Sequence, residues 1–143
     1  MKLVVDANVL VGEVLRQRGR ALLRHPDLRI YSAEQVLGET RYELRRRLMA
    51  MVSQSKLTEV TERELLELVN HTIDNYITSL ALSFYSSWET EARKRIPRDP
   101  DDWHTIALAL ALNAAIWTQD YDFFGCGCPV WTTETLLLQI ESF

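Results

Sequence analysis

Short apolar runs alternate with longer amphipathic segments along the chain, and this alternation constrains the fold more than any other feature. Runs typical of strands lie at residues 2–6, 27–32, 80–86, 114–118 and 128–132. Segments with helical spacing separate most of them. Strands that alternate with helices predict a parallel sheet covered by helices on both faces. The sequence therefore indicates an α/β fold.

The helical segments carry start signals that place their beginnings. We expect helices over residues 8–25, 33–51, 61–77, 87–96, 100–112 and 133–140. Ser32 and Thr61 each open a capping-box pattern, with Gln35 and Glu64 three positions later. Asp99 has the place and the side chain of an N-cap for the apolar helix that follows it.

Composition indicates one globular domain over residues 1–143. Apolar residues make up 47% of the chain and charged residues 25%, so a core can form without disulfides or metals. The two cysteines, Cys126 and Cys128, lie too close in sequence for an ordinary disulfide, and no second pair completes a zinc site. No apolar run has transmembrane length, and the N-terminus does not resemble a signal peptide. We expect a cytoplasmic protein that does not enter a membrane.

The charge balance is acidic overall but uneven along the chain. The net charge is −4, which does not mark the whole protein as a polyanion binder. Arginine and lysine nevertheless cluster at residues 16–24, 41–47 and 93–98. Such runs are either solvated helix faces or a basic rim around an acidic centre. A metal-dependent nuclease needs the second arrangement, because cations bind the phosphates while acids hold the metal.

Aspartates gather at positions that a parallel sheet would bring together. Asp6 ends the first run, Asp120 and Asp122 follow the run at 114–118, and Asp101 and Asp102 begin the helix that leads into that run. Ligand sites of such sheets lie at the carboxyl ends of strands. Capping and the helix dipole explain part of the acid cluster before that helix. Converging carboxylates repel one another unless a cation is present, and hard oxygen ligands suit Mg²⁺ or Mn²⁺.

Four segments of the sequence resemble PIN-domain ribonucleases, including the toxin subunits of VapBC-type toxin–antitoxin pairs. They are VVDANVL, SAEQVLGETRYELRRRL, RDPDDWHTIALALAL and IWTQDYDFF, and they occur in the family's order over nearly the whole chain. The resemblance implies a three-layer α/β/α sandwich with a central, mostly parallel sheet. It also implies a four-acid site for Mg²⁺ or Mn²⁺ and hydrolysis of RNA phosphodiester bonds.

The family's site residues carry over to matching positions in this chain. The four acids of the catalytic and metal site correspond to Asp6, Glu39, Asp102 and Asp120, with Asp101, Asp122 and Asn8 as auxiliary residues. Asp101 is nearly as good a match as Asp102 for the family's acid at the start of this helix. Glu39 lies opposite the stripe of Leu37 and Leu44 on its helix, so a plain solvent-facing glutamate is also consistent with its position. The segment QDYDFF lacks the family's basic residue, so a cation that positions the RNA backbone must come from elsewhere.

The resemblance also implies partners: an RNA substrate, an antitoxin protein and a second copy of the chain in a homodimer. An alternative is a PIN-fold interaction module that acts mainly through an antitoxin or an RNA-processing complex. The two alternatives differ in whether purified protein cuts RNA, and a small DNA-binding protein encoded in the neighbouring reading frame would identify an antitoxin. A haloacid-dehalogenase-like phosphatase is disfavoured because Asn8 stands where that family needs a second aspartate.

Overall fold

A computed structural model describes residues 1–141 of the chain. Its centre is one five-stranded sheet in which all pairings are parallel and the strand order is β3-β2-β1-β4-β5. The strands are β1 (Lys2–Val5), β2 (Arg29–Ala33), β3 (Ile77–Leu80), β4 (Ala115–Trp117) and β5 (Val130–Trp131). The parallel sheet predicted from the alternation of strands and helices is confirmed.

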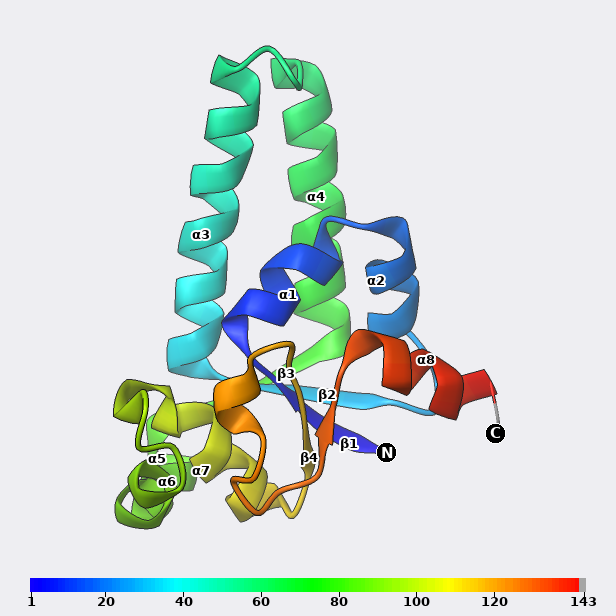
Figure 1. The fold of residues 1–143 in the computed structure, drawn as a ribbon. Coiled ribbons are helices and arrows are strands. Elements are labelled where there is room, and N and C mark those ends of the chain that lie inside the picture. Colours follow the sequence, from blue (N-terminus) through cyan, green and yellow to red (C-terminus); the bar gives the residue numbers. More distant parts are fainter. Residues whose placement is uncertain (142–143) are drawn as a thin grey trace.

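Helices connect the strands and cover both faces of the sheet (Figure 1). The α-helices are α1 (Ala7–Val14), α2 (Gln17–Leu23), α3 (Glu34–Ser53), α4 (Glu59–Tyr76), α5 (Leu82–Tyr85), α6 (Glu89–Arg95), α7 (Trp103–Leu112) and α8 (Thr133–Glu141). Three short 3₁₀ turns are η1 (Ser86–Trp88), η2 (Pro100–Asp102) and η3 (Tyr121–Phe123). None of the helices over residues 1–141 is both long and apolar enough to cross a membrane.

Alternation along β1 divides the core between the two faces of the sheet. Leu3 and Val5 pack in a cluster with side chains of α1, α2, α3, α4 and α8, whereas Val4 packs in a second cluster with side chains of α5, α6 and α7. Burial of an aliphatic side chain of this size stabilises the fold by about 1.5–3 kcal/mol. The fold is therefore a three-layer α/β/α sandwich, as the resemblance implied.

The long helices α3 and α4 form an antiparallel pair that extends well beyond the sheet (Figure 1). Leu44 and Val69 are buried between this pair and the rest of the core. Arg41 of α3 links the two helices, because its guanidinium donates hydrogen bonds to Asn70 at 3.0 Å and to Asp74 at 2.8 Å.

Two sequence-based expectations about element boundaries were wrong. The helical pattern at residues 8–25 forms two helices, α1 and α2, with a turn at Leu15 and Arg16. Gly19 of α2 packs directly on the backbone of Glu13 in α1, and a Cβ at position 19 would overlap the Glu13 carbonyl oxygen. The strand expected at 80–86 is shorter and earlier, since β3 ends at Leu80 and residues 82–85 form α5.

The predicted helix caps also differ from the observed ones. Ser32 belongs to β2, and its hydroxyl donates to the Ala33 carbonyl rather than capping α3. Helix α4 begins one turn earlier than expected, with Thr58 as its cap and Thr61 donating its N–H to the Thr58 hydroxyl at 3.1 Å. Asp99 makes no side-chain capping bond, because the 3₁₀ turn η2 separates it from α7.

The positions of β1 and β4 determine where the candidate site lies. Val5 pairs with Trp117, so the residues that follow each strand leave the sheet side by side at its carboxyl edge. Asp6 follows β1, and Thr118 and Asp120 follow β4. The sequence-based expectation that these two acid-bearing strand ends would meet is confirmed.

A candidate acidic active site

Asp6 is a buried carboxylate that also begins a helix. It is 5% exposed, and its Oδ1 accepts a hydrogen bond from the Val9 N–H at 2.9 Å as the N-cap of α1. Its Oδ2 accepts a hydrogen bond from the Thr118 hydroxyl. Burial raises the pKa of Asp6, and the Asp120 charge adds to this, while the two hydrogen bonds act in the opposite direction.

Thr118 connects Asp6 to the second strand end. Its side chain is fully buried, and its oxygen accepts a hydrogen bond from the Asp120 N–H at 2.9 Å while its hydroxyl donates to Asp6. Asp120 in turn caps η3, because its Oδ1 accepts from the Asp122 N–H at 2.9 Å. One threonine therefore fixes the relative positions of two acids that are more than a hundred residues apart in sequence.

The two candidate acids at the start of α7, Asp101 and Asp102, both lie in the 3₁₀ turn η2 but have different surroundings. Asp102 interacts electrostatically with Asp99, Asp120 and Asp6, and burial together with these charges raises its pKa to about 7. Asp101 has a side chain that is 96% exposed and forms an ion pair of 3.8 Å with Arg93. Asp102 is therefore the acid of this pair that belongs with Asp6 and Asp120.

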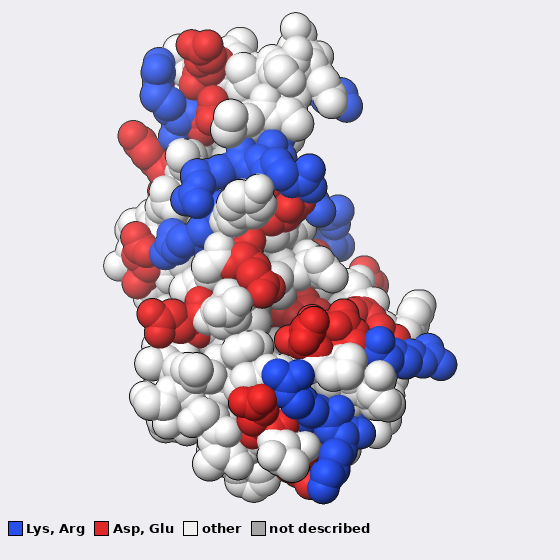
Figure 2. Space-filling view, turned by 90° about the vertical axis from the view of Figure 1, so that its left-hand side faces the viewer, with Lys and Arg blue, Asp and Glu red and all other residues white. Residues whose placement is uncertain are grey.

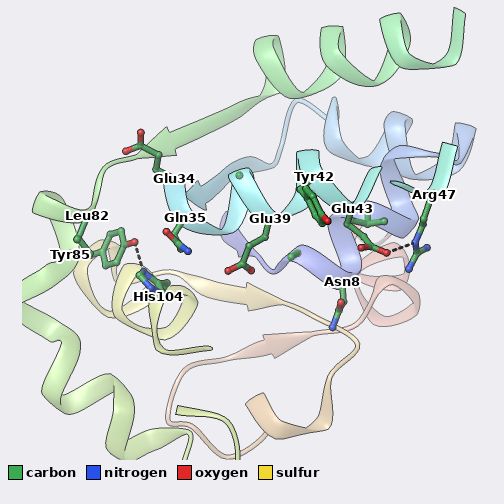
Figure 3. A pocket seen from close by; sticks show the side chains of 13 residues that line it. Asn8, Glu34, Gln35, Glu39, Tyr42, Glu43, Arg47, Leu82, Tyr85 and His104 are labelled. Carbon is green, nitrogen blue, oxygen red and sulfur yellow. Dashed lines mark hydrogen bonds and ion pairs between the residues drawn. The ribbon is translucent and has the colours of Figure 1, made fainter. Parts of the chain in front are cut away.

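One cavity of about 100 Å³ brings the predicted residues together. Its lining includes Asp6, Asn8, Glu39, Asp101, Asp102 and Asp120, so six of the seven predicted residues contribute to it. Glu39 reaches the cavity from α3, and its carboxylate points into the space between that helix, His104 and Asn8 (Figure 3). Glu39 is exposed, which agrees with the solvent-facing alternative. Its side chain nevertheless lines this cavity.

Asp122, the seventh predicted residue, lies outside the cavity lining. Arg98 forms an ion pair of 3.7 Å with Asp122, as Arg93 does with Asp101 at 3.8 Å. Over residues 1–141, by contrast, none of Asp6, Asp102 and Asp120 forms an ion pair with a basic side chain. We call Asp6, Asp102 and Asp120 the inner acids. Unlike Asp101 and Asp122, they have no arginine partner among residues 1–141.

The inner acids have the chemistry of ligands for a hard divalent cation. Every donor they offer is an oxygen, and burial, with smaller contributions from neighbouring acids, raises the pKa values of Asp6 and Asp102, so a bound cation would stabilise their charged forms. No three His, Cys, Asp or Glu side chains among the described residues already stand where they could jointly hold one metal ion. The donor set fits Mg²⁺ or Mn²⁺ by its chemistry.

The surface around the cavity alternates in charge. Figure 2 shows acidic side chains gathered across the middle of this face, with basic side chains above and below them. The basic residues of α3 include Arg45, Arg46 and Arg47, which are all exposed. Arg46 and Arg47 both pair with Glu43, at 2.7 Å and 3.4 Å, so part of their charge is compensated.

A second, larger cavity of about 730 Å³ adjoins the acidic one and shares Ala7, Asn8, Glu39 and His104 with it. The hydroxyl of Tyr85 and Nδ1 of His104 share a hydrogen bond of 2.7 Å (Figure 3). The His104 ring also stacks on Trp103 with 4.0 Å between ring centroids. Burial lowers the pKa of His104, so its imidazole is neutral at pH 7. Burial raises the pKa of Tyr85 to about 12.

Sequence reasoning missed two residues that organise the site. Thr118 looked like an ordinary strand residue, and Tyr85 lay in a segment that was expected to be a strand. The available signal for Thr118 was its hydroxyl at the end of an otherwise apolar run, directly before the acids of QDYD. Tyr85 carried no comparable signal, because its partner His104 lies 19 residues away on another helix.

Comparison with solved structures finds proteins that share this fold. The chain shares its fold with PAE2754 from Pyrobaculum aerophilum (TM-score 0.67, 15% identity, 100% of this chain and 97% of that one). It also resembles VapBC2 from Rickettsia felis, whose structure contains a DNA fragment from its promoter (TM-score 0.62, 14% identity, 92% and 98%). FitAcB from Neisseria gonorrhoeae is a third similar structure (TM-score 0.54, 18% identity, 90% and 96%).

Comparison of the sequence with curated proteins gives no match. A family model described as "PIN domain", however, matches residues 4–141. This range contains both strand ends of the acidic cavity and the helices α3 and α7 that contribute Glu39 and Asp102. The resemblance seen in the four sequence segments is thus confirmed, and the chain belongs to the PIN-domain family.

Proposed function

We propose that this protein is a metal-dependent endoribonuclease of the toxin type. The observation that carries the proposal is the meeting of Asp6, Asp102 and Asp120 at one cavity, where none of the three forms an ion pair with a basic side chain of residues 1–141. PIN domains are a family of nucleases, so hydrolysis of a phosphodiester bond is the reaction class we expect. The proposal goes further in naming RNA as the substrate and Mg²⁺ or Mn²⁺ as the cofactor.

The proposed metal ligands are Asp6, Glu39, Asp102 and Asp120. A divalent ion bound by these acids would activate water and stabilise charge on the scissile phosphate. Thr118 holds the Asp6 carboxylate in place, and the capping bond from the Val9 N–H fixes its other oxygen. Asn8 and Asp101 line the same cavity and serve as auxiliary residues. The expected products carry 5′-phosphate and 3′-hydroxyl ends.

We propose that basic side chains near the cavity bind the RNA backbone. The segment after β4 contains no basic residue, but Arg93 and Arg98 lie close enough to the acids to pair with Asp101 and Asp122. Each pair is longer than 3.5 Å and solvent-exposed, so it costs little to exchange the carboxylate for a phosphate. These two arginines are our candidates for the cation that QDYDFF lacks.

The proposed partners are an antitoxin protein and a second copy of the chain. The resemblance to VapBC-type toxins supports both partners, and the fold shared with VapBC2 adds support for the antitoxin. A reading frame next to the gene that encodes a small DNA-binding protein would support the antitoxin. Its absence would favour the alternative in which the chain acts in an RNA-processing complex.

The test is cleavage of a long RNA by purified protein with Mn²⁺, with Mg²⁺ and with chelator. Asp6→Asn should lower the cleavage rate at least about a thousandfold, because it removes a charged ligand of the metal. Glu13→Gln is the matched control, since Glu13 is an equally buried acid on α1 that does not line the cavity. It should cut at a rate within about twofold of the original protein.

Cleavage that requires the metal and is lost only in Asp6→Asn would support the proposal. Circular dichroism of both variants would establish that the fold is intact. Cleavage that persists in folded Asp6→Asn would contradict the assignment of this residue. An original protein that cuts no RNA with either metal, while it forms a stable complex with another protein, would favour the interaction module.

A further inference from the structure

The larger cavity lies beside the proposed site, and most of its lining has no role in the proposed reaction. It has a volume of about 730 Å³, which lies within the range of about 300–1,000 Å³ typical of pockets for small ligands. It opens beside the acidic cavity, and Asn8, Glu39 and His104 line both. A group that enters it would therefore lie directly next to a phosphate bound at the inner acids.

The wall of this cavity combines a flat aromatic ring with hydrogen-bond acceptors. Tyr42 of α3 is 64% exposed although it is a large aromatic residue, and it lines the cavity with the apolar Val11 and Leu82. The Gln35 amide and the Glu39 carboxylate point into the same space from α3 (Figure 3). An exposed aromatic ring is a stacking surface for a base, and amide and carboxylate oxygens accept hydrogen bonds from base amines.

The charge of the lining excludes a phosphate as the occupant. Three glutamates, Glu34, Glu39 and Glu43, line the cavity, and its one basic residue, Arg47, is bound to Glu43 at 3.4 Å. Such a lining repels a phosphate group. Adenine, cytosine and guanine each have an exocyclic amine that fits the acceptors, whereas uracil has none.

We propose that the larger cavity holds one unpaired nucleoside of the RNA, next to the scissile phosphate, and favours a base with an exocyclic amine over uracil; this rests on the proposed ribonuclease function. The base stacks on Tyr42 and donates its amine to the Gln35 amide oxygen, which leaves Glu39 for its proposed role as a metal ligand. We expect the base to come from a single-stranded segment, because a paired base would first have to be unstacked and unpaired at an energetic cost. The ribose lies at the junction of the two cavities, where Tyr85 holds the neutral His104 ring.

Binding to the cavity can be measured without metal and without cleavage. Adenosine, cytidine and uridine are titrated separately into the ¹⁵N-labelled protein, and the backbone amides of residues 35–42 are followed by NMR. Adenosine and cytidine should shift these amides, and uridine should bind more weakly. Tyr42→Ala should weaken adenosine binding about tenfold, whereas Tyr42→Phe should retain it, because only the first variant loses the stacking ring.

Met49→Ala is the matched control, because Met49 lies on the same helix, is 66% exposed and does not line the cavity. It should bind adenosine like the original protein. Methylguanidinium is the second probe, since an arginine side chain is the other group that an acidic cavity could accept. Shifts with methylguanidinium and none with any nucleoside would overturn the proposal and assign the cavity to a partner protein.

Cleavage mapping then connects the cavity to specificity. Sequencing the 5′ ends of products from a long unstructured RNA should reveal a preference for a base with an exocyclic amine over uracil at one position beside the cut. Tyr42→Ala should reduce this preference about tenfold. Cleavage without any base preference, together with no nucleoside binding, would overturn the cavity assignment and leave the ribonuclease function standing. Nucleoside binding without cleavage by any metal would support the cavity and contradict the ribonuclease.

Discussion

Asp6 and Glu13 are buried acids of the same helix, and they differ in the charges around them. Asp6 is 5% exposed and Glu13 is 6% exposed, and α1 carries both, as its cap and as its seventh residue. Each accepts a hydrogen bond from a buried threonine, Thr118 for Asp6 and Thr133 for Glu13. A survey of buried carboxylates alone would rank them equally.

Their surroundings separate them. Glu13 has two arginines, Arg16 and Arg18, at 3.8 Å and 3.7 Å, and its Oε2 is buried without a hydrogen-bond partner among the described residues. Asp6 has hydrogen bonds to both oxygens but interacts with another acid, Asp120, rather than with a base. Concentrated negative charge, held in place and left without a cation, distinguishes the candidate site from an incidental buried acid.

Substitution of the threonine partners of Asp6 and Glu13 should show the largest difference in cleavage rate between the two regions. Thr118→Val removes the hydroxyl that bonds Asp6 and Asp120, so we expect cleavage to fall about 10–100-fold, as when the partner of a metal ligand is lost. Thr133→Val removes a partner of Glu13 and of the Trp117 Nε1–H, which donates to it at 3.1 Å. It should leave cleavage within about twofold and cost about 1–2 kcal/mol of folding free energy.

Initial rates over a Mn²⁺ titration, with thermal unfolding of both variants, measure these effects. If the two valine variants lost activity equally, the distinction between the regions would fail. If Thr118→Val lost only stability, Thr118 would be a structural residue and not one that positions the site.

The comparison also explains how much of the site could be predicted from sequence. Asp6 and Asp120 were identified because acids after buried strands meet at the edge of a parallel sheet, and β1 and β4 are neighbours. The distinction between Asp101 and Asp102 depends on η2, whose tight turn directs adjacent residues to different surroundings. Local sequence contains no information about that turn's orientation relative to Asp6.

The fold was predictable in its layers but not in its details. Apolar runs and helical spacing indicate the sheet and its cover. The end of α4 and the beginning of β3 at Ile77 depend on pairing with Ile30 of β2, which lies far away in sequence. Thr118 was missed for the same reason, since its role depends on Asp6 across 112 residues.

The next effect is a dependence of stability on pH in metal-free protein. The pKa of Asp102 is raised to about 7, so the folded state binds more protons than the unfolded state between about pH 4 and pH 7. Stability from this group is present at low pH and is lost as pH rises toward 7. After allowance for solvent screening of a partly exposed carboxyl, we expect a loss of about 1–2 kcal/mol.

Urea unfolding of metal-free protein at pH 5 and pH 7.5, beside Asp102→Asn, measures this loss. The variant should show a smaller decrease, and Mn²⁺ should restore stability at pH 7.5 because it binds the folded state. Equal pH dependence in the variant and the original protein would exclude Asp102 as the source.

The smallest effect is expected at Glu13. Glu13→Gln replaces a buried charge whose Oε2 has no partner by a neutral amide of similar size. The lost attraction to Arg16 and Arg18 is small because both guanidinium groups are exposed. We expect a change of less than about 1 kcal/mol in unfolding free energy, measured by urea titration at pH 7.5. A loss above about 3 kcal/mol would identify Glu13 as a true buried ion pair.

The central place of β1 in the sheet has a consequence for synthesis on the ribosome. Leu3 pairs with Ala115, so the strand made first must wait for one of its two neighbours until most of the chain exists. At about 5–20 residues per second, that interval lasts on the order of ten seconds. During it Asp6 has neither Thr118 nor Asp120 beside it. A chain released before β4 would therefore lack part of the acidic site, and the proposed activity would begin only after β4 and Asp120 have been made.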